Sequence, residues 1–556
     1  MKTTTIGKYL LDQLYTRGVR HIFGVPGDYV LKMDKLIEEH RIQYVNTTRE
    51  NTAGYMADAY ARMKGLGVAC ITYGVGVNIT NAMAQAYVES SPIVVISGAA
   101  GASETHHSPH LHHLINSHRK DERDCTQFEI FRNVSIDQAL LDDPDTALDA
   151  IDRVLYSCLR FQKPVYIEIP RDMVDKEVTW RQPLAPEAPK SDPVALEEAL
   201  NEIVNILKSS QKPVLWIGHE TQRLGLVQDA FKFAEKYCIP ITTSLLGKGA
   251  INEHSPLFVG VYQGGISNAV VTQFVDDCDL LISLGVLLSD VNTGIFSAKL
   301  NHPHSITANA EQVAIDHHRY QEVNFTDIVK ALAQSEYNIL FRHPYPTANC
   351  KKKNVSKPTT QKITSTLLFN TLQNHLQSDH ILVADIGDSL FGCTDLIVEQ
   401  DAFFACAFFA SLGFCVPAAI STQLVAPKKR VIALVGDGAF QMTCTELSTA
   451  VRYSIDPIII VLNNHGYGTE RPLLEGAFND IVNWRYAELP KLLGGGKGVR
   501  VQTEAEFDKA LTYALAHRGE FQLIEIELDK TDFSPAMQRF STLVKNKDKK
   551  TSDKDL

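Results

Sequence analysis

The stretch from Val431 to Gly438 reads VIALVGDG, a short β-branched run that leads directly into Gly-Asp-Gly. A second run, Ile458 to Leu462, leads into the segment NNHG at residues 463–466. In an open parallel sheet, ligands collect at the carboxyl ends of the strands. Two glycines let the backbone approach a phosphate closely, while the aspartate between them can face a cation. The two stretches therefore predict a phosphate and metal site at the edge of a parallel sheet.

Asp437, Asn464 and Gly466 are the candidate metal ligands. Mg²⁺ requires a tight octahedron of oxygens and is usually held by few protein groups together with phosphates. The Asp437 carboxylate, the Asn464 side-chain oxygen and the Gly466 carbonyl would supply half of this shell, and a diphosphate and water would complete it. Either motif alone is more typical of a turn or a helix cap, but the two together favour a site.

Short β-branched runs alternate with helical patterns along the whole chain, which at 556 residues is too long for one hydrophobic core. Two proline-rich stretches, Gln182–Pro193 and His343–Thr360, suit exposed connections and divide the chain into thirds. We therefore predict an α/β fold of three parallel-sheet domains. The expected domains span residues 1–181, 194–342 and 361–540, followed by a charged tail over 541–556.

The composition excludes several classes of protein. A hydrophobic share of 44% and a charged share of 21% are those of a globular chain, and a net charge of -11 argues against a nucleic-acid partner. The ten cysteines show no metal-binding spacing and are expected to be reduced and mostly buried. The apolar run Ala402–Ile420 contains Ser411, Gly413 and Pro417, so we expect buried backbone there and no membrane span. The N-terminus has no signal-peptide pattern, and a cytoplasmic location is expected.

The spacing of the two motifs carries a resemblance to a known family. GDG at 436–438 is followed by NN at 463–464 after the intervening residues 439–462, which resembles the signature of thiamin-diphosphate-dependent enzymes. The resemblance runs from Ile22 to Leu528. It implies pyrimidine-binding, middle and diphosphate-binding domains in that order, with thiamin diphosphate and Mg²⁺ as cofactors.

Glu50 is the candidate activating residue. It closes the strand-like run Tyr44–Arg49 and precedes a helical pattern over Asn51–Met63. A glutamate there could equally be a helix-start charge favoured by the helix dipole. Its setting resembles the family's glutamate followed by ADGYAR, with Ala59 in place of the usual glycine. The resemblance implies that the Glu50 carboxyl holds the cofactor's aminopyrimidine in the tautomer that activates the thiazolium carbon.

Four further residues resemble the acid–base set of the pyruvate, indolepyruvate and phenylpyruvate decarboxylases. They are Asp28, His112, His113 and Glu470, and histidines and shifted carboxylates can transfer protons near neutral pH. Taken singly, Asp28 is more typical of a turn and Glu470 of a solvated helix start. The stretch from Glu104 to His118 also holds His106, His107, His110 and His118, so it could be a solvent-facing or metal-scavenging loop.

The resemblance also implies further cofactor contacts in the last third. Leu412 would bend the cofactor, and the Ala410 carbonyl would accept a hydrogen bond from the aminopyrimidine. The remaining cofactor-binding candidates are Asp388, Gly436 and Gly438, together with Glu50, Asp437 and Asn464. The sequence departs from the family in a longer, more charged loop over Leu114–Gln127 and in Leu390 and Thr469, which suggest a roomier substrate pocket.

The predicted activity is non-oxidative decarboxylation of a 2-oxo acid to an aldehyde and CO₂, the acid being pyruvate or a larger branched-chain or aromatic one. The alternatives are a carboligase of the acetohydroxyacid synthase kind and a catalytically silent binding relative. Glu50 and Asp437 lie in different predicted domains, and the resemblance implies that they come from two subunits. A homodimer or homotetramer with the site between subunits is therefore expected, with no nucleic acid or membrane as partner.

Overall fold

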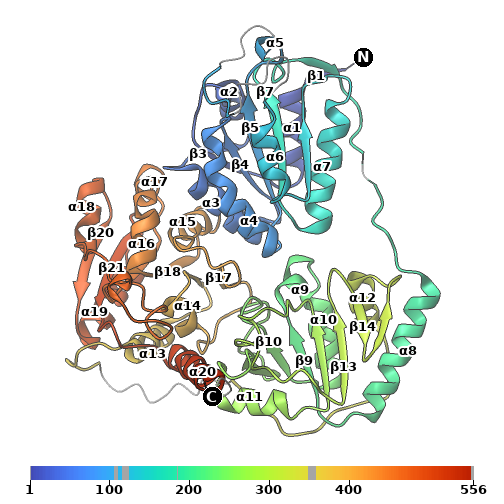
Figure 1. Ribbon diagram of the computed structural model, residues 1–556, viewed down its shortest axis with the longest axis vertical. Coiled ribbons are helices and arrows are strands. Elements are labelled where there is room, and N and C mark those ends of the chain that lie inside the picture. Colours follow the sequence, from blue (N-terminus) through green and yellow to red (C-terminus); the bar gives the residue numbers. More distant parts are fainter. Residues whose placement is uncertain (1, 106–110, 116–123, 185, 349–357, 553–556) are drawn as a thin grey trace. The chain divides into compact units, whose positions relative to one another are not determined.

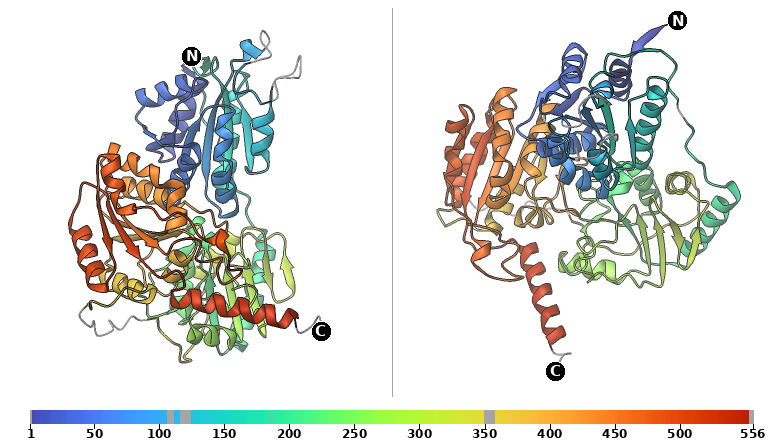
Figure 2. Two further views of the ribbon diagram at one scale, coloured as in Figure 1. Left: turned by 60° about the vertical axis from the view of Figure 1, so that its left-hand side comes forward. Right: turned by 45° about the horizontal axis from the view of Figure 1, so that its top comes forward.

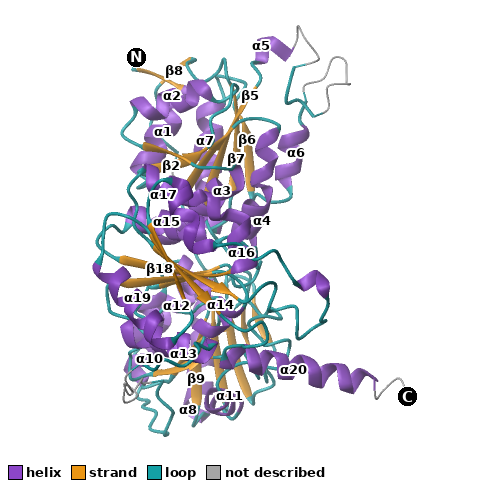
Figure 3. Ribbon diagram, turned by 90° about the vertical axis from the view of Figure 1, so that its left-hand side faces the viewer, coloured by secondary structure: helices purple, strands orange, loops and turns teal. Residues whose placement is uncertain are grey.

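The structure is a computed structural model that describes residues 2–105, 111–115, 124–184, 186–348 and 358–552. The chain forms two compact units. Unit 1 comprises Met1–Ala188, Val416–Pro427 and Thr443–Ile455, and unit 2 comprises Pro189–Cys415, Lys428–Met442 and Asp456–Leu556. Figures 1 and 3 show helices flanking the strands of each large sheet.

The main sheet of unit 1 has six parallel strands in the order β3-β2-β4-β5-β7-β6. Its strands are β2 (His21–Gly24), β3 (Gln43–Asn46), β4 (Gly67–Ile71), β5 (Ile93–Ala99), β6 (Asp137–Leu140) and β7 (Val165–Pro170). A separate antiparallel pair joins β1 (Thr3–Thr5) to β8 (Glu177–Thr179). The helices are α1 (Ile6–Thr16), α2 (Leu31–Glu39), α3 (Glu50–Lys64), η1 (Val75–Ile79), α4 (Thr80–Val88), α5 (Ala102–Thr105), α6 (Thr126–Arg132), α7 (Ala147–Phe161), η2 (Cys444–Glu446), α17 (Leu447–Arg452) and all but the first residue of α15 (Cys415–Val425).

The first sheet of unit 2 has seven strands in the order β11-β10-β9-β12-β13-β14-β15. They are β9 (Pro213–Ile217), β10 (Ile241–Thr243), β11 (Phe258–Val261), β12 (Leu280–Leu284), β13 (His304–Ala308), β14 (Val313–Ile315) and β15 (His318–Tyr320). Its helices are α8 (Pro193–Ser209), α9 (His219–Arg223), α10 (Val227–Tyr237), α11 (Ala269–Asp276) and α12 (Phe325–Gln334). The strands from β11 to β13 run parallel, whereas β14 and β15 add an antiparallel edge.

The second sheet of unit 2 has six parallel strands in the order β17-β16-β18-β19-β21-β20. They are β16 (His380–Ala384), β17 (Phe403–Ala405), β18 (Arg430–Gly436), β19 (Ile458–Asn463), β20 (Lys497–Val501) and β21 (Gln522–Glu527). The remaining helices are α13 (Ser365–His375), α14 (Asp388–Cys393), α16 (Asp437–Thr443), η3 (Ala477–Asn479), η4 (Tyr486–Glu488), α18 (Leu489–Leu493), α19 (Glu504–Ala516) and α20 (Pro535–Ser552). The prediction of three α/β domains with parallel sheets is thus confirmed.

The central strands are apolar along their whole length because helices cover both faces of a parallel sheet. All residues of β5 and β19 are buried, and β18 is buried as far as Val435. The two six-stranded sheets share one strand order, in which the direction of the connections reverses between β2 and β4 and again between β16 and β18. Such reversals leave crevices at the carboxyl edge where ligands bind.

Several sequence predictions concern parts of the chain away from these edges. The apolar run Ala402–Ile420 forms β17 and the start of α15 and is largely buried. The described cysteines form no disulfides and most are buried, while Cys350 lies outside the described residues. Helix α20 continues to Ser552, so most of the backbone of the predicted tail is helical (Figure 2). Within the described ranges, the structure contains no helix with the length and apolarity that a membrane crossing requires.

Candidate active site

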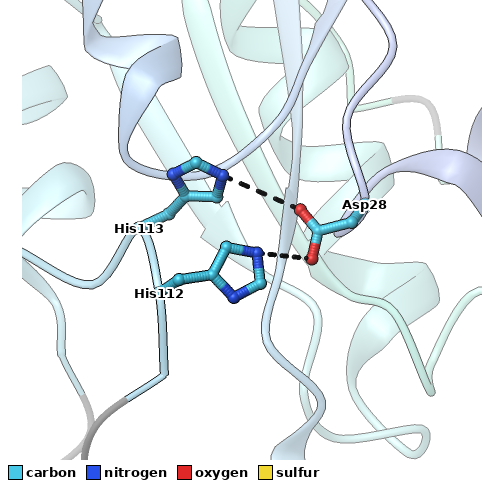
Figure 4. Close-up of side chains that lie close together, drawn as sticks. All are labelled: Asp28, His112 and His113. Atoms are coloured by element: carbon cyan, nitrogen blue, oxygen red, sulfur yellow. Dashed lines mark ion pairs between the residues drawn. The ribbon is translucent and has the colours of Figure 1, made fainter.

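Asp28, His112 and His113 lie together in unit 1. Asp28 follows β2, and the two histidines lie in the described segment 111–115 beyond β5, so all three come from loops at the carboxyl edge of the sheet. His112 Nε2 lies 3.0 Å from Asp28 Oδ2, and His113 Nε2 lies 3.9 Å from Asp28 Oδ1. Both imidazoles point toward the one carboxylate (Figure 4). Imidazole and carboxylate groups placed in this way can serve as proton donors and acceptors.

Tyr29 and Gly74 position the backbone of the two histidines. The Tyr29 hydroxyl donates to the His112 carbonyl oxygen over 2.8 Å, and its ring stacks on the His112 imidazole with centroids 5.2 Å apart. His113 has a φ of 69°, in the left-handed region. Gly74 approaches so closely that a Cβ there would lie 2.2 Å from the His113 carbonyl oxygen. Two other loops therefore fix where the imidazoles stand.

Gln127 ties Gly74 to the interior of unit 1. It is fully buried at the start of α6, where its Oε1 accepts from Gly74 N over 2.7 Å. Its Nε2 donates to Ser97 Oγ and to the Tyr166 hydroxyl, both over 2.8 Å. The predicted longer loop thus ends on a buried anchor, although residues 116–123 of that loop lie outside the described residues.

Arg171 and Glu104 set the charge beside Asp28. Arg171 Nη1 lies 3.9 Å from Asp28 Oδ2, while its Nε donates to Glu104 over 3.0 and 3.1 Å and its Nη2 over 2.5 Å. These hydrogen bonds from Arg171 hold the pKa of Glu104 below its usual range, so Glu104 stays ionised. The Glu104 charge offsets that of Arg171, so Asp28, Arg171 and Glu104 together carry one negative charge when all three are ionised.

Glu50 is the first residue of α3 and not the end of a strand, because β3 already stops at Asn46. The strand-like run predicted to reach Arg49 is therefore too long by three residues. Asn78 Nδ2 donates to Glu50 Oε2 over 2.9 Å. This bond leaves Glu50 Oε1 for another partner and fixes the direction of the carboxyl group. Asn78 belongs to η1, the short helix that begins directly after Gly74. Sequence reasoning did not single out Asn78.

Asp437, Asn464 and Gly466 converge in unit 2. Asp437 begins α16 directly after β18. Asn464 directly follows β19, the strand that pairs with β18. One end of the Asn464 amide lies 2.9 Å from the Gly466 carbonyl oxygen and 3.2 Å from Asp437 Oδ1. With the amide oxygen at that end, it faces two other oxygens, an arrangement that a cation stabilises. With the nitrogen there, the amide donates to both oxygens instead.

These separations match a magnesium site. Adjacent ligands of an octahedral Mg²⁺ with bonds of about 2.1 Å lie about 3.0 Å apart. Asp437 is fully buried, and burial raises the pKa of its carboxyl to about 7, although Gly438 N and Gly466 N donate to it over 2.8 and 3.1 Å. A divalent cation would compensate the buried negative charge. The residues present therefore fit the predicted metal.

One of the three glycines at this edge leaves room for a ligand. A Cβ at Gly436 would meet no described heavy atom within 4 Å, so nothing in the described structure packs against that position. At Gly438 a Cβ would lie 2.7 Å from the Tyr467 ring, and at Gly466, where φ is 144°, it would lie 1.9 Å from the Asn479 carbonyl oxygen. Gly438 and Gly466 are thus required by packing, whereas Gly436 borders open space.

Asp385 organises the loop that carries Ala410 and Leu412. Asp385 is fully buried, and its carboxylate accepts from Gly413 N over 3.1 Å and from Cys415 N over 2.9 Å. Burial raises the pKa of Asp385 to about 7. Ala410 has a φ of 61°, and Leu412 is half-buried. Asp385 follows β16 at the carboxyl edge, and this position was the signal that could have singled it out.

The remaining candidates have other surroundings. The Asp388 carboxylate accepts from Ser534 N over 2.9 Å and also from Ser534 Oγ, which joins α14 to the start of α20, and burial raises its pKa to about 6. Glu470 is exposed in a turn after the Asn-Asn segment. Leu390 is fully buried in the core of unit 2, and Thr469 is half-buried. His106, His107, His110 and His118 lie outside the described residues.

Comparison with known proteins agrees with this organisation. Three sequence profiles match in order: the thiamine pyrophosphate enzyme N-terminal TPP-binding domain over residues 4–122, the central domain over 200–335 and the C-terminal TPP-binding domain over 385–526. The chain therefore belongs to the thiamin-diphosphate-dependent enzymes.

Individual relatives narrow the family. The chain is 36% identical to an indole-3-pyruvate decarboxylase from Azospirillum brasilense, covering 96% of this chain and 97% of the relative. It is 30% identical to pyruvate decarboxylase isozyme 3 of Saccharomyces cerevisiae, with the same coverage, and 29% identical to an alpha-keto-acid decarboxylase of Mycolicibacterium paratuberculosis over 95% of this chain and 94% of the relative. Within the thiamin-diphosphate-dependent enzymes, the chain falls in the 2-oxo acid decarboxylase family, whose members are carboxy-lyases.

Proposed function

We propose that this chain catalyses the Mg²⁺-dependent, non-oxidative decarboxylation of a 2-oxo acid, pyruvate or a larger branched-chain or aromatic one, to an aldehyde and CO₂. When bound, thiamin diphosphate supplies the nucleophilic carbon that attacks the 2-oxo group and the thiazolium that accepts the electrons released with CO₂. The protein's part is to bind this cofactor, hold its tautomer and move protons.

The cofactor's charged end is assigned to the second sheet of unit 2. Asp437, the Asn464 amide oxygen and the Gly466 carbonyl would hold Mg²⁺, and the open backbone at Gly436 would admit a diphosphate oxygen. Ala410, Leu412 and Asp388 are proposed to contact the rest of the cofactor. For Ala410 and Leu412 the support is their loop, which is anchored on Asp385. Asp388 already accepts a hydrogen bond from Ser534, so it can also act by positioning α14 beside the cofactor.

Glu50 is proposed to hold a proton against the ring nitrogen of the aminopyrimidine. Its bond from Asn78 fixes one carboxyl oxygen and orients the other. Glu50 is the first residue of α3, so its carboxyl group lies at the positive end of the helix dipole. A glutamine at this position would keep the shape of the side chain and lose the acid.

Asp28, His112, His113 and Glu470 are proposed to carry the proton transfers that follow loss of CO₂. The observation that carries the proposal is the convergence of two imidazoles on one carboxylate at the carboxyl edge of the unit 1 sheet. A carboligase joins its intermediate to a second substrate and has no need for three proton-exchanging groups at this place. The geometry therefore favours protonation and aldehyde release.

The test is aldehyde formation from a panel of 2-oxo acids with Mg²⁺ and thiamin diphosphate present. Comparing kcat/KM for pyruvate, branched-chain and aromatic acids identifies the preferred substrate. Release of aldehyde and CO₂ in equal amounts supports the proposal. A two-substrate condensation product would favour the carboligase, and cofactor binding without turnover would favour a silent relative.

The proposal also covers how the chain is divided into domains and how its subunits assemble. We propose that residues 1–181, 194–342 and 361–540 act as pyrimidine-binding, middle and diphosphate-binding domains, and that the site is completed in a homodimer or homotetramer. A cytoplasmic location remains a prediction. A sizing experiment checks the assembly, since full activity in a monomer would contradict a site shared between subunits.

A further inference from the structure

Asp28, His112 and His113 form a cluster of potential metal ligands. One ligand atom from each, two imidazole nitrogens and a carboxylate oxygen, lie within 4.8 Å of one another. Within the described residues, no other group of three His, Cys, Asp or Glu side chains has its ligand atoms this close together. Two imidazoles with one carboxylate are a common ligand set for divalent transition metals.

The distances are close to those of a tetrahedral zinc site. With bonds of about 2.1 Å, two ligand atoms of tetrahedral Zn²⁺ lie about 3.4 Å apart. His112 Nε2 lies 3.0 Å from Asp28 Oδ2, and His113 Nε2 lies 3.9 Å from Asp28 Oδ1, the other oxygen of the same carboxylate, and these two separations bracket that value. His112, the most exposed of the three, has a side chain 63% accessible, so small side-chain rotations can bring the atoms into place. The backbone need not move.

The supporting contacts make the cluster preorganised. Tyr29 holds the His112 carbonyl and stacks on its ring, and Gly74 packs against the His113 backbone. A site whose ligands are already placed binds metal without ordering a loop first. The Glu104 carboxylate offsets the Arg171 charge, so the cluster as a whole is negative when the imidazoles are neutral.

We propose that Asp28, His112 and His113 bind a divalent transition-metal ion such as Zn²⁺, and that this ion reversibly inhibits the enzyme. The inhibition rests on the proposed function, because the metal would occupy the Nε2 lone pairs that exchange protons with the substrate. Binding itself does not rest on it.

The chemistry of the donors separates this cluster from the magnesium site. Asp437, Asn464 and Gly466 offer oxygens alone, which suit Mg²⁺, whereas imidazole nitrogens suit Zn²⁺, Fe²⁺ or Co²⁺. Saturating Mg²⁺ should therefore fill the oxygen site and leave the histidine cluster available. This selectivity makes the two sites distinguishable in one protein.

The binding experiment is calorimetric titration of the full chain with Zn²⁺ in the presence of saturating Mg²⁺. We expect one ion per chain, and a loss of affinity of at least about tenfold in Asp28→Asn and in His113→Ala. His304→Ala is the matched control, because His304 Nδ1 pairs with Asp316 Oδ2 over 2.9 Å without a third ligand. A second control replaces His106, His107, His110 and His118 by glutamine and should bind like the parent.

Unchanged affinity in Asp28→Asn and His113→Ala overturns the site, and so does loss of binding in the second control alone. The inhibition is measured separately, as aldehyde release with Mg²⁺ in excess and rising Zn²⁺. We expect a falling rate that a zinc-selective chelator restores. A rate that a further increase in Mg²⁺ restores would place the ion at the oxygen site and refute the inhibition as proposed. Absence of turnover without any zinc would instead refute the proposed function, while the calorimetry still decides the site.

Discussion

Replacing Gly74 by alanine should displace the two histidines while leaving both side chains in the sequence. Gly74 has φ 77° and ψ -77°, and Val75 N donates to the Tyr73 carbonyl over 3.0 Å, which defines a γ-turn. An added Cβ would lie 2.2 Å from the His113 carbonyl oxygen, whereas real Cβ atoms stay beyond 3.0 Å, so the two segments must separate by at least 3.0 - 2.2 = 0.8 Å. The neighbour is backbone, and no rotamer change can relieve the overlap.

A displacement of about 1 Å in a group that acts on the substrate costs roughly a hundredfold in rate. We therefore expect kcat for Gly74→Ala to fall about a hundredfold, which corresponds to about 2.7 kcal/mol in the activation free energy. The backbone strain of a side chain at positive φ adds a loss of stability of about 1–3 kcal/mol. Aldehyde release measures the first effect and thermal unfolding the second.

Gly18→Ala is the matched control. Gly18 has a φ of 92° in the same unit, and a Cβ there would meet no described heavy atom within 4 Å. The control carries the strain of positive φ without the overlap, so it should lose some stability and keep the parental kcat. A parental kcat in Gly74→Ala would refute the reasoning, and so would an equal loss of rate in both variants.

Three further predictions concern the cofactor site and the core. Glu50→Gln should keep its cofactor affinity in calorimetry and lose about 10²–10⁴ in kcat. Asn78→Ala removes one hydrogen bond worth about 1 kcal/mol, so its kcat should fall only several-fold. Equal losses of kcat in the two variants would contradict the assigned roles. Because the Asp437 carboxyl has its pKa raised to about 7, it is protonated at lower pH and must lose a proton to bind Mg²⁺, so affinity should weaken about tenfold between about pH 8 and about pH 6, and equal affinities would refute this. Tyr9→Phe removes a buried hydroxyl that donates to Asp152 over 2.9 Å and should destabilise by about 1–3 kcal/mol, which would show as a lower melting temperature with unchanged kcat.

The motifs that sequence reasoning could find share one property. Their residues are near one another in the sequence, or they are separated by a fixed spacing. Gly-Asp-Gly and Asn-Asn each follow an apolar strand, and adjacent parallel strands bring their carboxyl ends together. Asp437, Asn464 and Gly466 could therefore be grouped from the order of residues alone. Asp28, in the loop after β2, was identified by the resemblance to the family's acid–base set, because alone it is more typical of a turn.

The supporting residues were beyond such reasoning. Asn78, Gly74 and Gln127 are ordinary residue types in ordinary positions, and their importance lies in contacts with Glu50, His113 and the buried interior. Asp385 stands at the carboxyl end of β16, but the order of residues does not show that its carboxylate accepts from the backbone of Gly413, 28 residues later in the chain. Long-range hydrogen bonds of this kind leave no period or spacing in a sequence.

The amino-acid order alone was enough to define the α/β class, the three apolar sheets, the candidate oxygen donors for a metal and the family of the chain, because strand burial and motif spacing are local properties. The shared strand order of the two six-stranded sheets, the end of β3 before Glu50 and the convergence of His112 and His113 on Asp28 were decided only in three dimensions. Each depends on contacts between segments tens of residues apart, whose formation is governed by packing and hydrogen bonding across the whole unit.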